Sequence, residues 1–354
     1  MSGRIGPHLP TDPKTGDAMS KTKSILTGIK PTGQVHIGNY AGMIRPTLDL
    51  MASNPDGDNY LFIANYHALN SIGDAGQIRQ FTHEVAACFL ALGLDLSHTN
   101  FYRQSDVPEV FELTQVLSSV TPKGLMNRAH AYKAAVDANA DKPSAQPDDG
   151  VNMGLFTYPI LMSADILLFD ADVVPVGKDQ IQHVEFARDI AGYFNRRYDT
   201  EFFTLPDHSV QENLEAIVGL DGRKMSKSYG NTIPLFADPK TRRKMINKIV
   251  TDSKLPEEPK DPDGNTVYEL YAALAEPAEV THLRARFEEG GMGYGDAKRI
   301  LADKLDELFE VPAARFAEYM TDPGELEAMM EKASRHAKER AAAKVEAMRT
   351  LIGT

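Results

Sequence analysis

Residues 24–40 read Ser-Ile-Leu-Thr-Gly-Ile-Lys-Pro-Thr-Gly-Gln-Val-His-Ile-Gly-Asn-Tyr, and the prediction of the fold starts from these residues. Its apolar first part, 24–29, predicts a β-strand that ends where Pro31 and Gly33 interrupt the pattern. Apolar residues at helical spacing follow, so a helix is predicted to begin near Gly38. A strand, a tight glycine-containing turn and a helix N-terminus make an anion site, because unpaired N–H groups and the positive end of the helix dipole point the same way.

Two residues at this predicted helix start have side chains suited to an anion. His36 and Asn39 lie three positions apart where the helix begins. Both can donate hydrogen bonds into the site that the turn creates.

A second stretch, far downstream, has the residue types that hold phosphate. Residues 222–230 read Gly-Arg-Lys-Met-Ser-Lys-Ser-Tyr-Gly. The cationic side chains of Arg223, Lys224 and Lys227 repel one another unless an anion lies among them. The two serines add hydroxyl donors for phosphate oxygens, and the terminal glycines let the loop move. A solvated basic loop is the alternative, and the local spacing does not decide between the two.

Strand and helix patterns alternate through the first part of the chain, with strands at 59–67 and 100–103 and helices at 74–92 and 107–120. This alternation predicts an α/β fold, a Rossmann-like doubly wound parallel sheet covered by helices. Ligands of such sheets bind at the carboxyl ends of the strands, which places the 24–40 turn and His67 on one rim. Neither a dinucleotide-binding glycine pattern nor a P-loop is present.

The composition describes a globular chain with an acidic surface. Of 354 residues, 42% are hydrophobic and 25% charged, and the single cysteine, Cys88, lies in an apolar helical stretch that predicts core packing. No apolar run approaches a membrane span and no signal peptide begins the chain, so we expect a cytoplasmic protein without membrane contact. A net charge of −12 argues against indiscriminate binding to nucleic-acid backbones, and no DNA partner is expected. The local basic excess at 221–250 favours selective contact with a polyanion.

Three segments follow from these patterns: a mobile polar tail at 1–22, a catalytic domain at 23–235 that includes the basic loop, and a helical domain at 236–354. The last segment is predicted to hold helices at 239–250, 266–275, 278–289, 294–310, 313–320 and 323–351. The final helix has a basic surface, and it either is solvated, packs back on the catalytic domain or faces a nucleic acid.

Two shorter features precede the basic loop. Arg128 and Lys133 are predicted on one helix, where a lysine is ordinarily just solvated. Residues 138–150 have the composition of a disordered loop, which is either a lid or a tolerated surface insertion.

Asp165 interrupts an otherwise apolar helical run at 158–169. A buried carboxylate needs a partner, which is either a neighbouring Arg, Tyr or backbone N–H, or a donor on a ligand. Residues 172–183 then read as strand, turn and helix start. Asp179 in that turn either binds ribose hydroxyls or caps the helix.

The HIGN sequence at 36–39 and the KMSKS sequence at 224–228 resemble the two signatures of the class I aminoacyl-tRNA synthetases. The segments 158–169 and 172–183 resemble the tryptophanyl-tRNA synthetase family, and the similarity runs from about Ser24 to Leu351. The resemblance implies a ligase that activates L-tryptophan with ATP and transfers it to tRNA(Trp). It also implies Mg²⁺ carried by the ATP rather than by a protein metal site, a homodimer, and a helical domain at 236–354 that binds the tRNA at its anticodon.

The resemblance assigns roles to residues at matching positions. The residues expected to act in catalysis are His36, Asn39, Lys224 and Lys227. Those expected to bind ATP are Lys30, Pro31, Thr32, Gly38, Asn39, Lys133, Gly177, Lys178, Asp179, Ala216, Ile217, Lys224, Met225, Ser226, Lys227 and Ser228. Those expected to bind tryptophan are Gly28, His67, Tyr158, Met162, Asp165, Val174, Val176 and Gln180.

The physics of the indole ring agrees with the role of Asp165. Indole offers one hydrogen-bond donor and no acceptor, so one carboxylate among apolar side chains is a suitable receptor. Such a site rejects phenylalanine by leaving the carboxylate unpaired, and this kind of discrimination reaches roughly 10⁴–10⁵-fold. Ring shape must help to exclude tyrosine, whose hydroxyl can also donate.

Three alternatives are open at this level. A tyrosine–tRNA ligase shares the fold and both signatures. A small-molecule nucleotidyltransferase would explain HIGN but not KMSKS or the helical C-terminal part. A catalytically silent RNA-binding relative would retain the fold without the chemistry.

Overall fold

The computed structural model describes residues 22–142, 144–210 and 217–354. Its centre is a five-stranded parallel sheet in the order β3-β2-β1-β4-β5. The strands are β1 (Ile25–Ile29), β2 (Asn59–Ile63), β3 (Asn100–Arg103), β4 (Val173–Val176) and β5 (Asp207–Val210). Because the strand order runs outward from β1 in both directions, the sheet is doubly wound, and the predicted Rossmann-like class is confirmed.

The centre of the sheet is buried on both faces, as is usual for a parallel sheet, whereas the edge strand β5 is partly exposed. One face, with Ile29, Leu61 and Phe101, packs against α4 (Ala75–Ala91). The other face, with Leu26 and Tyr60, packs against α5 (Glu109–Ser118), α8 (Met153–Leu167), α9 (Ile181–Arg197) and α14 (Pro323–Ile352). Cys88 lies on α4 and is fully buried, which confirms its core role, and burial raises the pKa of its thiol.

The remaining helices lie after β1, between the strands and in the C-terminal part of the chain. The helix after β1 is continuous and consists of α1 (Ile37–Asn39), a π-helical turn (Tyr40–Ile44) and α2 (Arg45–Ala52). Shorter helices are α3 (Asn65–Ala68), α6 (Lys123–Met126), α7 (His130–Ala140) and 3₁₀ turns at Gln104–Asp106, Lys178–Gln180 and Lys227–Tyr229. The C-terminal helices are α10 (Pro239–Ile246), α11 (Thr266–Ala272), α12 (Pro277–Glu289) and α13 (Tyr294–Thr321).

Four local predictions differ from the structure. β2 ends at Ile63, and His67 lies on the one-turn helix α3 beyond the strand. Arg128 lies in the turn between α6 and α7 rather than on a helix. The exposed strand β5 was not predicted, because its sequence, Asp-His-Ser-Val, is mostly polar. The predicted break near 311–312 is absent, since α13 runs through Pro312, although proline has no backbone N–H to donate there.

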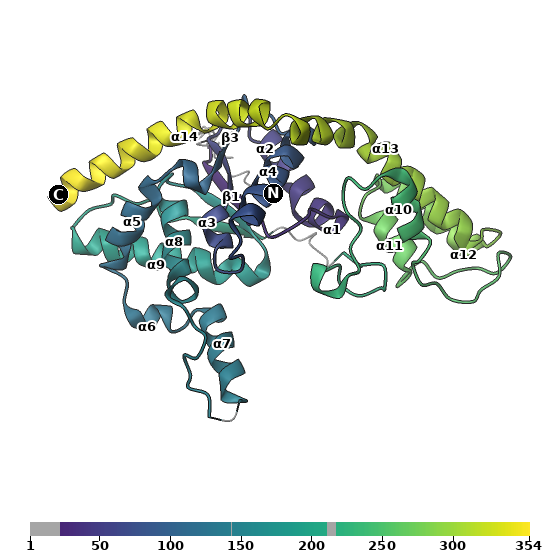
Figure 1. Ribbon diagram of the computed structural model, residues 1–354, viewed down its shortest axis with the longest axis horizontal. Helices are drawn as coiled ribbons and strands as arrows, with labels where there is room; N and C mark the ends of the chain where they lie inside the picture. The colour runs from purple at the N-terminus through teal and green to yellow at the C-terminus, as the bar shows by residue number, and fades with distance from the viewer. Residues whose placement is uncertain (1–21, 143, 211–216) are drawn as a thin grey trace, which may run out of the picture.

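The two longest helices, α13 and α14, follow each other across the top of Figure 1 and meet at Asp322. α13 packs against α4, α10 and α11, whereas α14 packs against the edge strand β3 and against α5. Four basic residues of α14 form ion pairs inside the chain: Lys338 with Glu331, Arg340 and Lys344 with Asp170, and Arg349 with Glu112. Within the described ranges, no helix has the length and apolar character needed to cross a membrane.

Candidate functional site

The HIGN residues first of all build the start of their own helix. His36 is the N-cap, and its Nδ1 accepts a hydrogen bond from the N–H of Asn39 at 3.3 Å. In return, Oδ1 of Asn39 accepts from the N–H of His36 at 3.1 Å. This reciprocal pair fixes both side chains at the carboxyl edge of β1.

The capping geometry also defines which donors His36 and Asn39 present. Because Nδ1 of His36 accepts, its ring proton lies on Nε2. Burial and the neighbouring charge of Lys227 lower the pKa of His36 to about 4, so the ring is neutral at pH 7. The imidazole Nε2–H and the Asn39 amide NH₂ are therefore the groups able to donate to a phosphate.

The KMSKS loop lies directly on the HIGN turn. Nζ of Lys227 donates to the carbonyl oxygen of Thr32 at 3.1 Å. The sulfur of Met225, a buried side chain, lies 3.2 Å from the backbone N of Gly38. The two stretches, far apart along the chain, are thus in contact.

Both glycines of the turn are needed for this contact. A Cβ on Gly38 would lie 3.1 Å from the His36 ring and 3.2 Å from the Met225 sulfur. Gly33 has φ +111°, a conformation that side chains rarely adopt, and its missing Cβ leaves room for Lys227.

Of the three cations in the loop, one is already paired. Arg223 forms an ion pair with Asp221 and lies over the Tyr229 ring, 4.5 Å from its centroid. Lys224 and Lys227 have no carboxylate partner among the described residues, and desolvation lowers the pKa of Lys227. Lys224 and Lys227 are therefore the charges that an anion would meet.

The serines of the loop are also ordered. The Ser226 and Ser228 hydroxyl oxygens lie 2.8 Å apart, and the N–H of Ser226 donates to Asn231 at 2.8 Å. Asn231 is buried and also donates to Asp221 at 2.6 Å, so it holds the loop in shape.

A buried polar group lies near the carboxyl ends of β2 and β3. Asp165 on α8 is 3% exposed. It accepts from Nε2 of His67 at 2.9 Å and from Nε2 of Gln104 at 2.9 and 3.0 Å. Burial raises the pKa of Asp165, while the bonds from His67 and Gln104 act in the opposite direction. The partners of Asp165 are thus a histidine and a glutamine, neither of which was on the predicted list of partner types.

Sequence reasoning missed Gln104, although a signal was present. The residue directly follows the correctly predicted strand β3, at the edge where ligands bind in such sheets. It is 1% exposed, and a buried glutamine at a strand end requires specific partners.

A second polar contact lies beside the first. The Tyr158 hydroxyl is 2.6 Å from Nε2 of His183, and the rings of Tyr158 and His67 are 6.3 Å apart. Burial, and then the charge of His130, lower the pKa of His183 to about 4, while burial raises that of Tyr158 to about 12. Nδ1 of His183 is buried and has no hydrogen-bond partner among the described residues. His183 was read only as part of a helix start.

The other residues predicted to bind tryptophan come from β1, α8, β4 and the 3₁₀ turn after β4. Val174 is buried, and Met162 and Val176 are half-buried in the same core. Gly28 packs against Phe62, whose ring a Cβ at position 28 would meet at 2.5 Å. Gln180 donates to Asp179 at 2.8 Å.

The predicted ATP residues separate into those near the contact of the two signatures and those elsewhere. Lys30, Pro31 and Thr32 follow β1, and the carbonyl of Ile217 accepts from the N–H of Met225 at 2.7 Å. Gly177, Lys178 and Asp179 follow β4. Asp179 is exposed and forms no cap with a helix, so the capping alternative is wrong. Ala216 lies outside the described residues.

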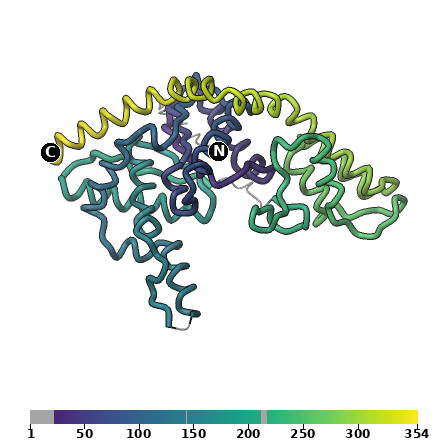
Figure 2. The backbone as a smooth tube through the Cα atoms, in the orientation of Figure 1, coloured from purple at the N-terminus to yellow at the C-terminus, as the bar shows by residue number. Residues whose placement is uncertain are grey.

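Lys133 is the one predicted phosphate ligand that is separated from the others. It is exposed on α7, which projects from the body at the bottom of Figures 1 and 2. α7 packs against α8.

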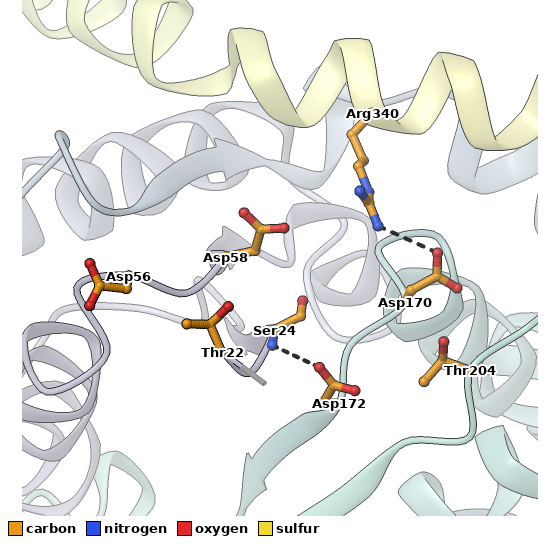
Figure 3. A pocket seen from close by; sticks show the side chains of 8 residues that line it. All are labelled: Thr22, Ser24, Asp56, Asp58, Asp170, Asp172, Thr204 and Arg340. Carbon is orange, nitrogen blue, oxygen red and sulfur yellow. Dashed lines mark hydrogen bonds and ion pairs between the residues drawn. The ribbon is translucent and has the colours of Figure 1, made fainter. Parts of the chain in front are cut away.

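A cavity of about 280 Å³ opens at the opposite, amino edge of the sheet (Figure 3). It is lined by Thr22, Ser24, Asp56, Asp58, Asp170, Asp172, Thr204 and Arg340. Its four aspartates would repel a triphosphate, so this cavity is excluded as the nucleotide site.

Comparisons with known proteins agree on one family. The model of tRNA synthetases class I (W and Y) matches residues 19–310. A protein of Neisseria meningitidis named tryptophan–tRNA ligase is 50% identical over 335 residues, which cover 95% of this chain and 98% of the relative. The protein of the same name from Bordetella parapertussis is 49% identical, over 93% of this chain and 72% of the relative.

Solved structures give the same result. The tryptophanyl-tRNA synthetase of Campylobacter jejuni, complexed with ADP and tryptophan, is 41% identical with a TM-score of 0.83, covering 94% of this chain and all of that one. The tyrosyl-tRNA synthetase of Archaeoglobus fulgidus shares the fold. It is 22% identical with a TM-score of 0.59, covering 84% of this chain and 91% of that one.

Proposed function

Because the chain belongs to the class I tryptophanyl-tRNA synthetases, we propose that it is a ligase that joins L-tryptophan to tRNA(Trp) at the site described above. The observation that carries the proposal is the contact of Lys227 with Thr32, which brings the two signatures together at the carboxyl edge of the sheet. Anion-binding groups of both stretches then face one nucleotide.

The first step is the activation of tryptophan. A carboxylate oxygen of tryptophan attacks the α-phosphorus of ATP, and the bond from that phosphorus to pyrophosphate breaks. The described groups bind and position rather than exchange protons: Lys224 and Lys227 neutralise the phosphates, and His36 donates through Nε2–H. Positioning and charge stabilisation carry most of the acceleration in reactions of this kind. Mg²⁺ is proposed to enter with ATP.

The second step transfers the amino acid. A hydroxyl of the terminal ribose of the tRNA attacks the carbonyl carbon of the adenylate, and AMP leaves. Asp165 is proposed to accept the indole N–H, with Met162, Val174 and Val176 around the ring. Gly177, Lys178 and Asp179 are proposed to hold the adenosine.

The roles of the C-terminal helices, the oligomeric state and the location are also proposals. The helices after residue 236 are proposed to contact the tRNA, and the protein is proposed to act as a homodimer in the cytoplasm. Four basic residues of α14 form ion pairs within the chain. These pairs reduce the positive charge that the helix can offer to RNA.

ATP–pyrophosphate exchange across a set of amino acids tests the function. We expect exchange with tryptophan. The exchange rate with phenylalanine or tyrosine should be lower by roughly 10³-fold or more. Exchange that prefers tyrosine would identify a tyrosine–tRNA ligase. Absence of exchange, together with retained tRNA binding, would identify a silent RNA-binding protein.

A further inference from the structure

Gln104 connects the turn after β3 with α3 and with Asp165 on α8. It lies directly after β3 and is almost fully buried between α3 and α8. Resting on the proposed function, we propose that Gln104 is a positioning residue that determines selection for tryptophan, because it holds the Asp165 carboxylate ready to accept a ring N–H.

The orientation of the Gln104 amide is unambiguous. Its Oε1 accepts from the backbone N–H of Tyr66 at 3.1 Å and of His67 at 3.4 Å. Its Nε2 therefore faces Asp165, where it donates to Oδ1 at 2.9 Å and to Oδ2 at 3.0 Å. A flipped amide would place Oε1 of Gln104 against the Asp165 carboxylate and its NH₂ group against the backbone N–H groups of Tyr66 and His67. One side chain thus ties the turn that bears His67 to the carboxylate.

The other groups facing Asp165 set its charge. His67 on α3 donates through Nε2 at 2.9 Å, and Tyr102 on β3 lies near enough to interact electrostatically with the carboxylate. Tyr158 on α8 and His183 on α9 lie beyond His67. Among these groups, only Gln104 donates to both oxygens of the carboxylate and cannot change its protonation state.

This arrangement matters because selection depends on an ionised acceptor. An ionised carboxylate can accept the indole N–H beside its bonds from His67 and Gln104, and phenylalanine offers no donor for that additional bond. A protonated carboxyl group can itself donate and loses that discrimination. Burial raises the pKa of Asp165, and Gln104 opposes the rise. Removal of Gln104 therefore moves Asp165 towards the neutral form as the pH falls.

Two substitutions with opposite pH behaviour test the proposal. Gln104→Leu keeps the volume and removes the donor, so we expect kcat/KM for tryptophan in the exchange assay to fall by about 10–100-fold, with an unchanged KM for ATP. The loss should grow from pH 8 to pH 6. Gln104→Glu places a second carboxylate beside Asp165, so it should be impaired at pH 8 and recover towards pH 6, because a protonated glutamate has the donor and acceptor pattern of glutamine.

The control is Gln115→Leu, since Gln115 is an exposed glutamine on α5. It should match the parent chain at every pH. Equal pH profiles for the two Gln104 variants, or an unchanged ratio of tryptophan to phenylalanine, would overturn the inference. If Gln104→Leu fails to fold, the pH response of Gln104→Glu decides alone. A parent chain without tryptophan exchange would instead refute the proposed function.

Discussion

At the scale of single residues, the three cations of the basic loop have different surroundings and should contribute differently to the reaction. Lys227 reaches the HIGN turn, and Lys224 has no carboxylate partner among the described residues, whereas Arg223 is paired with Asp221. Only charges that an incoming phosphate can meet without breaking an internal ion pair are well placed to stabilise a transition state.

We therefore expect Lys227→Ala to lower kcat of tryptophan-dependent exchange by about 10²–10³-fold while tryptophan affinity changes little. Stopped-flow kinetics of adenylate formation, together with equilibrium tryptophan binding, would measure the two quantities separately. Arg223→Ala is the matched control and should retain most of the rate. Equal losses of rate and tryptophan affinity in Lys227→Ala would remove its transition-state role.

Stability should depend on pH through His183. Its pKa is lowered from 6.5 to about 4 in the folded chain, so between these values the unfolded chain binds more protons. The stabilisation is fully present above pH 6.5 and is lost as the pH falls towards 4. At pH 5 this lost contribution is about 1–2 kcal/mol.

Urea unfolding at pH 7 and pH 5 measures this contribution. His183→Phe keeps an aromatic ring and cannot titrate, so its free energy of unfolding should fall less between these pH values than that of the parent chain. If the free energy of unfolding falls equally in the two proteins, His183 takes up its proton equally in the folded and the unfolded chain.

Single residues also show where sequence reasoning stops. Asp165 could be selected because a carboxylate in an apolar helical run demands a partner. The identity of that partner could not be read, since Gln104 and His67 reach it from two other elements. Hydrogen bonds between residues distant along the chain leave no periodic trace in the sequence.

At the scale of elements, the helix start after β1 depends on a missing side chain at position 38. A Cβ there would press on both the His36 ring and the Met225 sulfur, so Gly38→Ala must displace the cap or the loop. We expect activity to fall by about tenfold or more, with a loss of stability of about 1 kcal/mol.

The control for this change is Gly295→Ala, in the first turn of α13, where a Cβ would meet nothing within 4 Å. It should leave activity unchanged and stabilise the chain by up to about 1 kcal/mol. Exchange rates and thermal unfolding of both variants check the pair. Full activity in Gly38→Ala would show that the loop is not held against this turn during the reaction.

Elements with a strong pattern could be predicted, and those whose form depends on neighbours could not. β3 was predicted with its observed ends, and α4 within one residue, because their apolar residues repeat at the right spacing. The continuity of α13 across Pro312 was missed, since a lone helix would break there. Residues on both sides of Pro312 are held by the core, since Phe309 is part of it and Phe316 packs against it.

At the scale of the whole molecule, one hydrophobic core crosses from the sheet into the C-terminal helices. It contains Ile29 and Val85 together with Leu301 and Phe309. Phe309 is fully buried, with its ring edge-on to Tyr40 at 4.9 Å. The change in sequence pattern near residue 236 predicted a domain boundary there but not a core shared by the two sides. Composition contains no information on contacts across such a boundary.

We expect Phe309→Ala to cost about 3–5 kcal/mol and to lower a single, cooperative unfolding transition. Calorimetry with near-ultraviolet circular dichroism would follow both parts of the chain. Val311→Ala, at a side chain that is 60% exposed, should change stability by less than about 0.5 kcal/mol. Two separate transitions, of which only one responds to Phe309→Ala, would show independent domains.

The meeting of α13 and α14 at Asp322 has a mechanical consequence. Asp322 ends one helix of 28 residues and begins another of 30, and its carboxylate accepts from the N–H groups of Gly324 and Glu325. At 1.5 Å per residue each helix is a rod of roughly 40–45 Å. A small rotation about the backbone of this one aspartate would be amplified many times at the far tip of α13, so the packing of α13 on α4 is what keeps the helices after residue 236 in place.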